Sequence, residues 1–169
     1  MAVRQIVTLP NEVLRRKARK CTEFGEELQT LIEDMIETMR QAPGVGLAAP
    51  QVGVSERVIV VEYRDEEKED IPPKLYALVN PEITRVSKET VSGTEGCLSL
   101  PGLLGDVERP GAVMVKGYSR RGQPVTIKAQ GWLARIFQHE IDHLNGVLFV
   151  DRAQRVWKPE SAEEAAAFD

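Results

Sequence analysis

Histidine and cysteine are scarce in this chain of 169 residues, which contains only two of each. Two cysteines cannot build a disulfide framework, so we expect free thiols and a reducing, cytoplasmic location. Aromatic residues make up only 5% of the chain, and no hydrophobic run approaches the length of a membrane span. Residues 1–6 lack the apolar stretch of a secretion signal. We therefore expect neither a secreted scaffold nor a membrane protein.

Charge of one sign is also not dominant, because 22 basic and 26 acidic side chains leave a formal net charge of −4. We expect no direct nucleic-acid binding from this balance. A hydrophobic content of 42% suffices for one core. We predict a single catalytic domain over residues 1–169 that ends in a C-terminal tail from about residue 152. The acidic run at residues 65–70 is most simply a solvated loop.

Both histidines lie in one five-residue segment, HEIDH, at residues 139–143. Positions four apart return to the same face of a helix, so both imidazoles can bind one metal ion. Glu140 would then lie close enough to take a proton from a water at that ion. The simpler alternative to a metal site is that both histidines lie at the surface and have no function. Good helix formers precede the segment and Asn145-Gly146 supplies a stop signal, so the pattern favours a helix with a metal site.

The same predicted helix has two apolar sides with different expected roles. One stripe is suited to a core and contains Leu133, Phe137, Ile141 and Leu144. Trp132 and Ile136 instead share the side of the histidines. They are candidate walls of an apolar pocket, with packing in the core as the alternative.

Two histidines leave a divalent ion short of ligands, so a third must come from elsewhere. Cys97 in EGCLS, residues 95–99, is the better candidate, because small neighbours allow close approach of the backbone. Acidic side chains downstream are weaker candidates because their segment looks poorly anchored, namely Glu160, Glu163 and Glu164. Cys21 could complete a closed Cys2His2 zinc site that holds the fold together and catalyses nothing. Such a site would have no use for Glu140.

A glycine-rich segment, GVGLAAPQ at residues 44–51, fits the same chemistry. Glycines allow close contact of a ligand with the backbone, and Gln51 offers an amide donor. Alone, the segment could merely be a helix stop. It lacks the Gly-Lys-Ser/Thr ending of a phosphate-binding loop.

Three segments together, GVGLAAPQ, EGCLS and QHEIDHLNG, resemble the three motifs of bacterial peptide deformylase in the same order along the chain. The resemblance extends from the sequence IVTLP at residues 6–10 through residue 149. It implies removal of the N-formyl group from the initiator methionine of new polypeptides, with release of formate. It also implies one divalent metal ion, Fe2+ in the cell, with Zn2+ or Ni2+ feasible in purified protein.

The resemblance assigns a role to each matched position. The metal ligands would be Cys97, His139 and His143, and Glu140 would be general base and then acid. Four more residues would contact the substrate: Gln51 and the backbone N–H of Leu98 at the oxyanion, Gly46 through backbone hydrogen bonds, and Val45 at the methionine side chain. A metallopeptidase that cuts ordinary peptide bonds and a non-catalytic zinc module remain alternatives.

Two departures from the family limit what the resemblance implies. Some bacterial members place an arginine near Leu104 that helps to hold the peptide, so recognition beyond the first residue does not carry over. The tail at residues 159–169 is acidic, whereas docking on ribosomal RNA favours basic residues. We expect N-formylmethionyl nascent peptides as partners, with at most transient proximity to the ribosome.

Periodicity predicts an α+β fold with mostly antiparallel strands packed around a central metal-binding helix. We expect a short helix from Pro10 and a second helix over residues 25–41. Strands are expected over residues 57–63, 76–80, 82–91, 112–119 and 124–130. The last two would form a hairpin.

Overall fold

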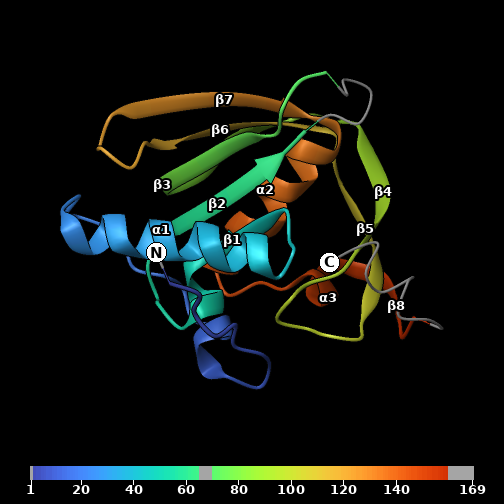
Figure 1. The fold of residues 1–169 in the computed structure, drawn as a ribbon. Helices are drawn as coiled ribbons and strands as arrows, with labels where there is room; N and C mark the ends of the chain where they lie inside the picture. The colour runs from blue at the N-terminus through green and yellow to red at the C-terminus, as the bar shows by residue number, and fades with distance from the viewer. Residues whose placement is uncertain (1, 65–69, 160–169) are drawn as a thin grey trace.

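The computed structural model describes residues 2–64 and 70–159, and it places two antiparallel sheets around one central helix (Figure 1). The helical elements are η1 Glu12–Arg15, α1 Glu26–Gln41, η2 Ala49–Val52, α2 Gly131–Leu144 and α3 Phe149–Arg152. The strands are β1 Gly46–Ala48, β2 Val58–Tyr63, β3 Lys74–Val86, β4 Thr90–Glu95, β5 Leu104–Pro110, β6 Ala112–Tyr118, β7 Pro124–Gln130 and β8 Ala153–Trp157. One sheet has the order β1-β2-β3-β6-β7 and the other β4-β5-β8. The α+β prediction is confirmed.

The five-stranded sheet separates two apolar clusters, because side chains of a strand point alternately to its two faces. Val58 and Val60 of β2 face the cluster that contains the buried side of α1. Ile59 and Val61 face the cluster that contains α2. The sheet therefore lies between the two long helices, as Figure 1 shows for α1 and α2.

Helix α2 lies at the centre of the fold and carries the HEIDH segment. Its predicted core stripe packs against the five-stranded sheet, with Phe137, Ile141 and Leu144 buried and Leu133 partly buried. The helix ends at the predicted stop, where the carbonyl of Leu144 accepts hydrogen bonds from the backbone N–H of Ala18 at 2.8 Å and from Arg57 at 2.9 Å. Neighbouring segments thus supply the hydrogen bonds that the last carbonyl of the helix cannot make within the helix.

The predicted strands at 76–80 and 82–91 are wrong in their boundaries. One strand, β3, runs through Pro81 to Val86, and β4 begins a different sheet at Thr90. Pro81 does not end the strand because the β3–β6 register shifts between Val79 and Glu82, which leaves room for a residue that cannot donate to the ladder.

Other segments differ from the sequence expectations. The short helix near Pro10 is a 3-10 helix, and the sequence missed β1, β5, α3 and β8. Strand β8 pairs with β5, so the chain is still part of a sheet at residues 153–157, within the expected tail. Residues 65–69 of the acidic run at 65–70 and the tail at residues 160–169 lie outside the described residues. Within residues 2–64 and 70–159, no helix is both long and apolar enough to span a bilayer.

Candidate active site

Three candidate metal ligands from two distant segments converge beside α2. The ligand atoms of Cys97, His139 and His143 all lie within 4.8 Å of one another. The Sγ of Cys97 is 3.3 Å from Nε2 of His143. The two histidines are one helical turn apart on α2, and Cys97 follows the end of β4. The structure thus brings together the thiol and the two imidazoles that the sequence selected.

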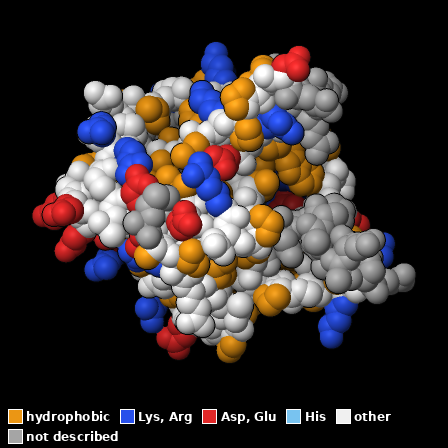
Figure 2. All heavy atoms as spheres, viewed as in Figure 1, with side chains coloured by type: hydrophobic (Ala, Val, Ile, Leu, Met, Phe, Trp, Pro, Cys, Tyr) orange, Lys and Arg blue, Asp and Glu red, His pale blue; other side chains and the backbone are white. Residues whose placement is uncertain are grey.

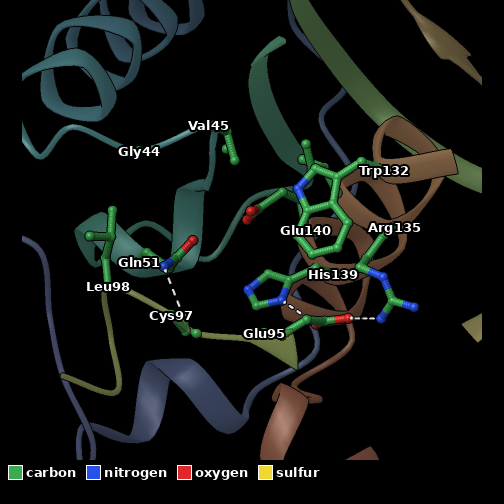
Figure 3. A pocket seen from close by; sticks show the side chains of 13 residues that line it. Gly44, Val45, Gln51, Glu95, Cys97, Leu98, Trp132, Arg135, His139 and Glu140 are labelled. Carbon is green, nitrogen blue, oxygen red and sulfur yellow. Dashed lines mark hydrogen bonds and ion pairs between the residues drawn. The ribbon is translucent and has the colours of Figure 1, made fainter. Parts of the chain in front are cut away.

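Glu95, the first residue of EGCLS, orients one of these histidines. Its Oε1 atom lies 2.9 Å from Nδ1 of His139, which leaves Nε2 of that ring for a metal (Figure 3). Arg109 donates two hydrogen bonds to the same carboxylate, at 2.6 and 2.9 Å, and Arg135 donates another at 2.6 Å. A carboxylate that holds the second nitrogen of a histidine is the usual outer partner of a metal ligand.

The buried charges set the protonation of this cluster. Burial raises the pKa of Glu95, but hydrogen bonds from Arg109 and His139 outweigh burial and hold that pKa far below its ordinary value. Burial lowers the pKa of His139, yet the hydrogen bonds that its ring donates to Cys97 and Glu95 raise that pKa well above its ordinary value. For His143, burial and the neighbouring His139 lower the pKa. Glu95 is therefore an anion that attracts positive charge to this site.

Glu140 lies next to the triad with one carboxylate oxygen unused. It is buried, and Oε1 has no hydrogen-bond partner among the described residues. Burial raises its pKa to about 7. A Cβ built on Gly46 would lie 2.6 Å from Oε2 of Glu140, so only glycine at position 46 allows the carboxylate to occupy this place. The glycine-rich segment and the HEIDH helix therefore pack against each other where Gly46 meets Glu140.

Gln51 and Leu98 lie on the other side of the cysteine. The side-chain amide of Gln51 donates to Sγ of Cys97 at 3.6 Å and to the hydroxyl of Ser99 at 3.2 Å, while its Oε1 accepts from the backbone N–H of Ala48 at 3.0 Å. These contacts fix the amide beside the ligand sulfur (Figure 3). Leu98 is half-buried in the same wall.

A pocket opens beside these groups, and every predicted substrate-binding residue lines it. The lining includes Val45, Gly46, Gln51, Leu98, Trp132 and Ile136, together with Glu95, Cys97, His139 and Glu140. Val45 and Trp132 are exposed, whereas Ile136 is buried and also packs in the core. Figure 2 shows hydrophobic side chains gathered around a recess in which an acidic group is visible.

Cys21 lies elsewhere, which removes the closed Cys2His2 alternative. Among the described residues, the group that could hold a metal contains Cys97 but not Cys21. Cys21 packs in the cluster that contains α1. Its backbone N–H donates a hydrogen bond to the side-chain oxygen of Asn80, and its carbonyl accepts one from the side-chain nitrogen of Asn80. Burial raises the pKa of its thiol to about 11, so the thiol stays protonated. The alternative ligands Glu160, Glu163 and Glu164 lie outside the described residues.

Sequence reasoning missed the buried ion-pair network around the triad. Arg109 bridges Glu95 to Asp142, which also accepts two hydrogen bonds from Arg152 at 2.6 and 3.0 Å. Arg135 was also missed, although it lies one turn before His139 on α2. Glu95 belongs to the EGCLS segment and Asp142 to the HEIDH segment. Their positions close in sequence to the candidate metal ligands were the signal that could have identified them. The sequence contains no such signal for the arginines, because their hydrogen-bond partners are distant in sequence.

The comparisons with known proteins agree with this geometry. The family model described as Polypeptide deformylase matches residues 3–158. A peptide deformylase of Symbiobacterium thermophilum is 53% identical over 90% of this chain and 67% of its own length. One from Natranaerobius thermophilus is 46% identical over 96% of this chain and 99% of its own length.

Solved structures give the same result. The crystal structure of peptide deformylase from Thermotoga maritima matches with a TM-score of 0.83 and 42% identity, over 92% of this chain and all of that one. A class I type b peptide deformylase from Acinetobacter baumannii, with Met-Ala-Ser bound, matches with a TM-score of 0.82 and 40% identity over 89% of this chain and 98% of that one. The chain therefore belongs to the polypeptide deformylase family and is a metal-dependent hydrolase.

Proposed function

We propose that Cys97, His139 and His143 hold one divalent ion, and that Glu140 transfers the proton during removal of the formyl group from N-formylmethionyl peptides. The observation that carries this proposal is the convergence of the three ligand atoms within 4.8 Å, next to a buried glutamate with a free oxygen. This arrangement leaves the pocket side of the cluster open to solvent and substrate. Catalytic metal sites commonly have three protein ligands and keep a fourth position for water or substrate.

The residues present fit a divalent ion. One thiolate and two imidazoles suit zinc, iron or nickel, and availability rather than affinity alone decides which is bound. The Glu95 carboxylate supplies the outer hydrogen bond that orients His139. We propose Fe2+ as the ion in the cell, because the resemblance implies it and the ligand set allows it. When bound, the ion would polarise the formyl carbonyl and lower the pKa of a water molecule.

Glu140 would accept a proton from the attacking water and return it to the leaving amine. Its Oε1 has no hydrogen-bond partner and its Oε2 packs against Gly46 at the pocket, so one carboxylate can serve both steps. The amide of Gln51 is fixed beside Cys97 and, with the backbone N–H of Leu98, would donate to the oxygen that gains negative charge. Loss of one such donor typically costs about 10²-fold in rate.

The lining of the pocket supports selection of the formyl group and the methionine side chain. A formyl carbon bears only hydrogen, so a narrow site beside Glu140 and Cys97 would admit it and exclude bulkier acyl groups. Val45, Trp132 and Ile136 would contact the methionine side chain. The relative from Acinetobacter baumannii has Met-Ala-Ser bound, a peptide that corresponds to a deformylated product. We propose nascent N-formylmethionyl peptides in the cytoplasm as substrates, met in transient proximity to the ribosome.

Activity on matched peptides tests this function. Metal-loaded protein should release free amine from formyl-Met-Ala and leave acetyl-Met-Ala intact. Cleavage of both would favour a broader amidase, and cleavage of neither at full metal occupancy would contradict the proposal. Glu140→Gln should keep the ion and lose on the order of 10²-fold or more of turnover, since it removes the acid/base group alone. Unchanged turnover would remove this assignment.

The choice of metal is tested separately by exposure to oxygen. A thiolate beside ferrous iron is open to oxidation, whereas nickel resists it. Iron-loaded protein should therefore lose activity faster in air than under argon, and nickel-loaded protein should not. Equal decay of both loadings would contradict the proposed role of iron.

A further inference from the structure

A recess lies where the five-stranded sheet extends past the end of α2 (Figure 1). It measures about 920 Å³ and is separate from the substrate pocket, because the two share no lining residue. Its walls come from the segment before β2, from the sheet and from the last turn of α2, and they include Lys17, Arg57, Ile83, Val125, Ile141 and Asn145. The reaction proposed above uses none of these residues.

The floor of the recess is apolar. Ile83 on β3, Val125 on β7 and Ile141 on α2 all belong to the cluster between the sheet and α2. Ile141 is buried, but Ile83 and Val125 are only partly buried because α2 ends beside them. An apolar group placed on this floor would remove its own surface and theirs from water.

Arg57 supplies a fixed cation at the edge of this floor. Its guanidinium donates to the carbonyl of Leu144 at 2.9 Å, to Oδ1 of Asn145 at 3.0 Å and to the carbonyl of Ala18 at 3.4 Å. All three acceptors are neutral, and they leave N–H groups of the guanidinium free for an anion. Among residues 2–64 and 70–159, no carboxylate forms an ion pair with Arg57. Burial lowers the pKa of Arg57, and the more distant charge of Glu82 offsets this only in part.

Lys17 and Lys20 stand at the rim of the recess. Both are exposed, and neither forms an ion pair with a carboxylate in the described part of the chain. The backbone between them is fixed, since Ala18 is buried and its N–H donates to the carbonyl of Leu144 at 2.8 Å. The two ammonium groups are therefore attached to a firm segment beside Arg57.

Positive charge is in excess around the recess, although the whole chain has a formal net charge of −4. One of the two acidic residues in the lining, Asp142, already accepts hydrogen bonds from Arg109 and Arg152. Four basic residues and two acidic residues line the space: Lys17, Lys20, Arg57 and Lys116 against Glu82 and Asp142. An anion is the ligand that this balance favours.

We propose that this recess binds an organic anion with an apolar body, of the class of medium-chain alkyl sulfates and carboxylates. The anionic group would contact Arg57 with Lys17 and Lys20 nearby, and the alkyl chain would lie on Ile83 and Val125. A small inorganic anion would leave the apolar floor in water, and a neutral hydrocarbon would leave Arg57 without an anion. The site is independent of the proposed function.

Three matched probes test the proposal by calorimetric titration of the metal-loaded protein at low salt. Octyl sulfate should bind one molecule per chain. Methyl sulfate, which keeps the charge without the chain, and octyltrimethylammonium, which keeps the chain and reverses the charge, should each bind at least about tenfold more weakly. Equal binding of methyl sulfate would contradict the apolar floor, and equal binding of octyltrimethylammonium would contradict the role of the cations.

Variants place the bound octyl sulfate in this recess. Lys17→Glu combined with Lys20→Glu should raise its Kd about tenfold at low salt, and by less at about 0.5 M salt. Lys88→Glu combined with Lys128→Glu is the matched control, because these exposed lysines lie outside the recess and change the net charge equally. The control should raise the Kd by much less, and equal effects of the two pairs would overturn the inference.

A change in the floor gives an independent test. Val125→Asp places a carboxylate where the alkyl chain would lie, so it should abolish binding of octyl sulfate. Binding as tight as in the wild type would overturn the inference. Arg57→Gln should also weaken binding more than the lysine pair does. If this variant fails to fold without its hydrogen bonds to the end of α2, Val125→Asp and the lysine pair still decide the question.

Discussion

The two sides of α2 are held by different interactions. Toward the five-stranded sheet the helix packs through apolar side chains, among them Phe137 and Ile141. Toward the three-stranded sheet it is held by a buried ion-pair network, defined by Glu95, Arg109, Arg135, His139 and Asp142. Apolar packing is non-directional, whereas hydrogen-bonded charges fix angles and distances. We infer that the apolar side stabilises the fold and that the charged side orients His139, the proposed metal ligand.

The largest expected effect comes from the charged side. Glu95→Ala would leave Arg109 and Arg135 buried without their shared partner, which typically costs about 3–5 kcal/mol of stability. Metal affinity should also fall about 10–100-fold, because His139 loses its outer hydrogen bond. Denaturant unfolding and metal titration measure the two losses. Glu108→Ala, at an exposed glutamate on β5, is the control, and equal metal affinity in both variants would contradict the division of roles.

The apolar side should respond in stability alone. Phe137→Ala removes a fully buried ring from the cluster between α2 and the sheet, and such changes cost about 3–5 kcal/mol. The folded fraction should keep its metal affinity and its kcat/KM, because no ligand loses a partner. Val86→Ala, at a residue 57% exposed, should change stability by no more than about 0.5 kcal/mol. If Phe137→Ala lost as much metal affinity as Glu95→Ala, the different roles of the two sides of α2 would be contradicted.

A smaller effect is expected at the second cysteine, which belongs to the apolar layer around α1. Cys21→Ser places a hydroxyl in a buried apolar site and should cost roughly 1–3 kcal/mol. The metal content should remain one ion per chain. Loss of the ion, measured by elemental analysis of the folded variant, would instead restore the closed Cys2His2 site.

The smallest effect concerns an ion pair outside both sides of α2. Burial raises the pKa of Asp34, but hydrogen bonds from the backbone of Ala2 and from Arg4 hold it below its ordinary value of 3.8. Because the folded pKa is depressed, this stabilisation is present above the unfolded pKa and is lost as pH falls through the folded pKa. Asp34→Asn should therefore be less stable than the wild type near pH 7, by roughly 1 kcal/mol. The difference should vanish in acid, and a constant difference in denaturant midpoint across pH would contradict it.

The sequence predicted the apolar side of α2 better than the charged side, and the reason is physical. The stripe of Phe137, Ile141 and Leu144 follows from a period of 3.6 residues, and the triad was selected because histidine and cysteine are scarce. Arg109 and Arg135 look like ordinary surface charges in sequence, because burial and pairing arise only when β4, β5 and α2 meet. Strand β5 was missed for the same reason, since charged residues interrupt its alternation. Strand β3 was divided at Pro81, where a shift in register cannot be read from composition.

X-ray absorption of zinc-loaded protein tests the central claim most directly, because it counts sulfur and nitrogen ligands at the ion. The account predicts one sulfur at about 2.3 Å and two imidazole nitrogens at about 2.0–2.1 Å, which correspond to Cys97, His139 and His143. Two sulfur ligands, or none, would contradict it.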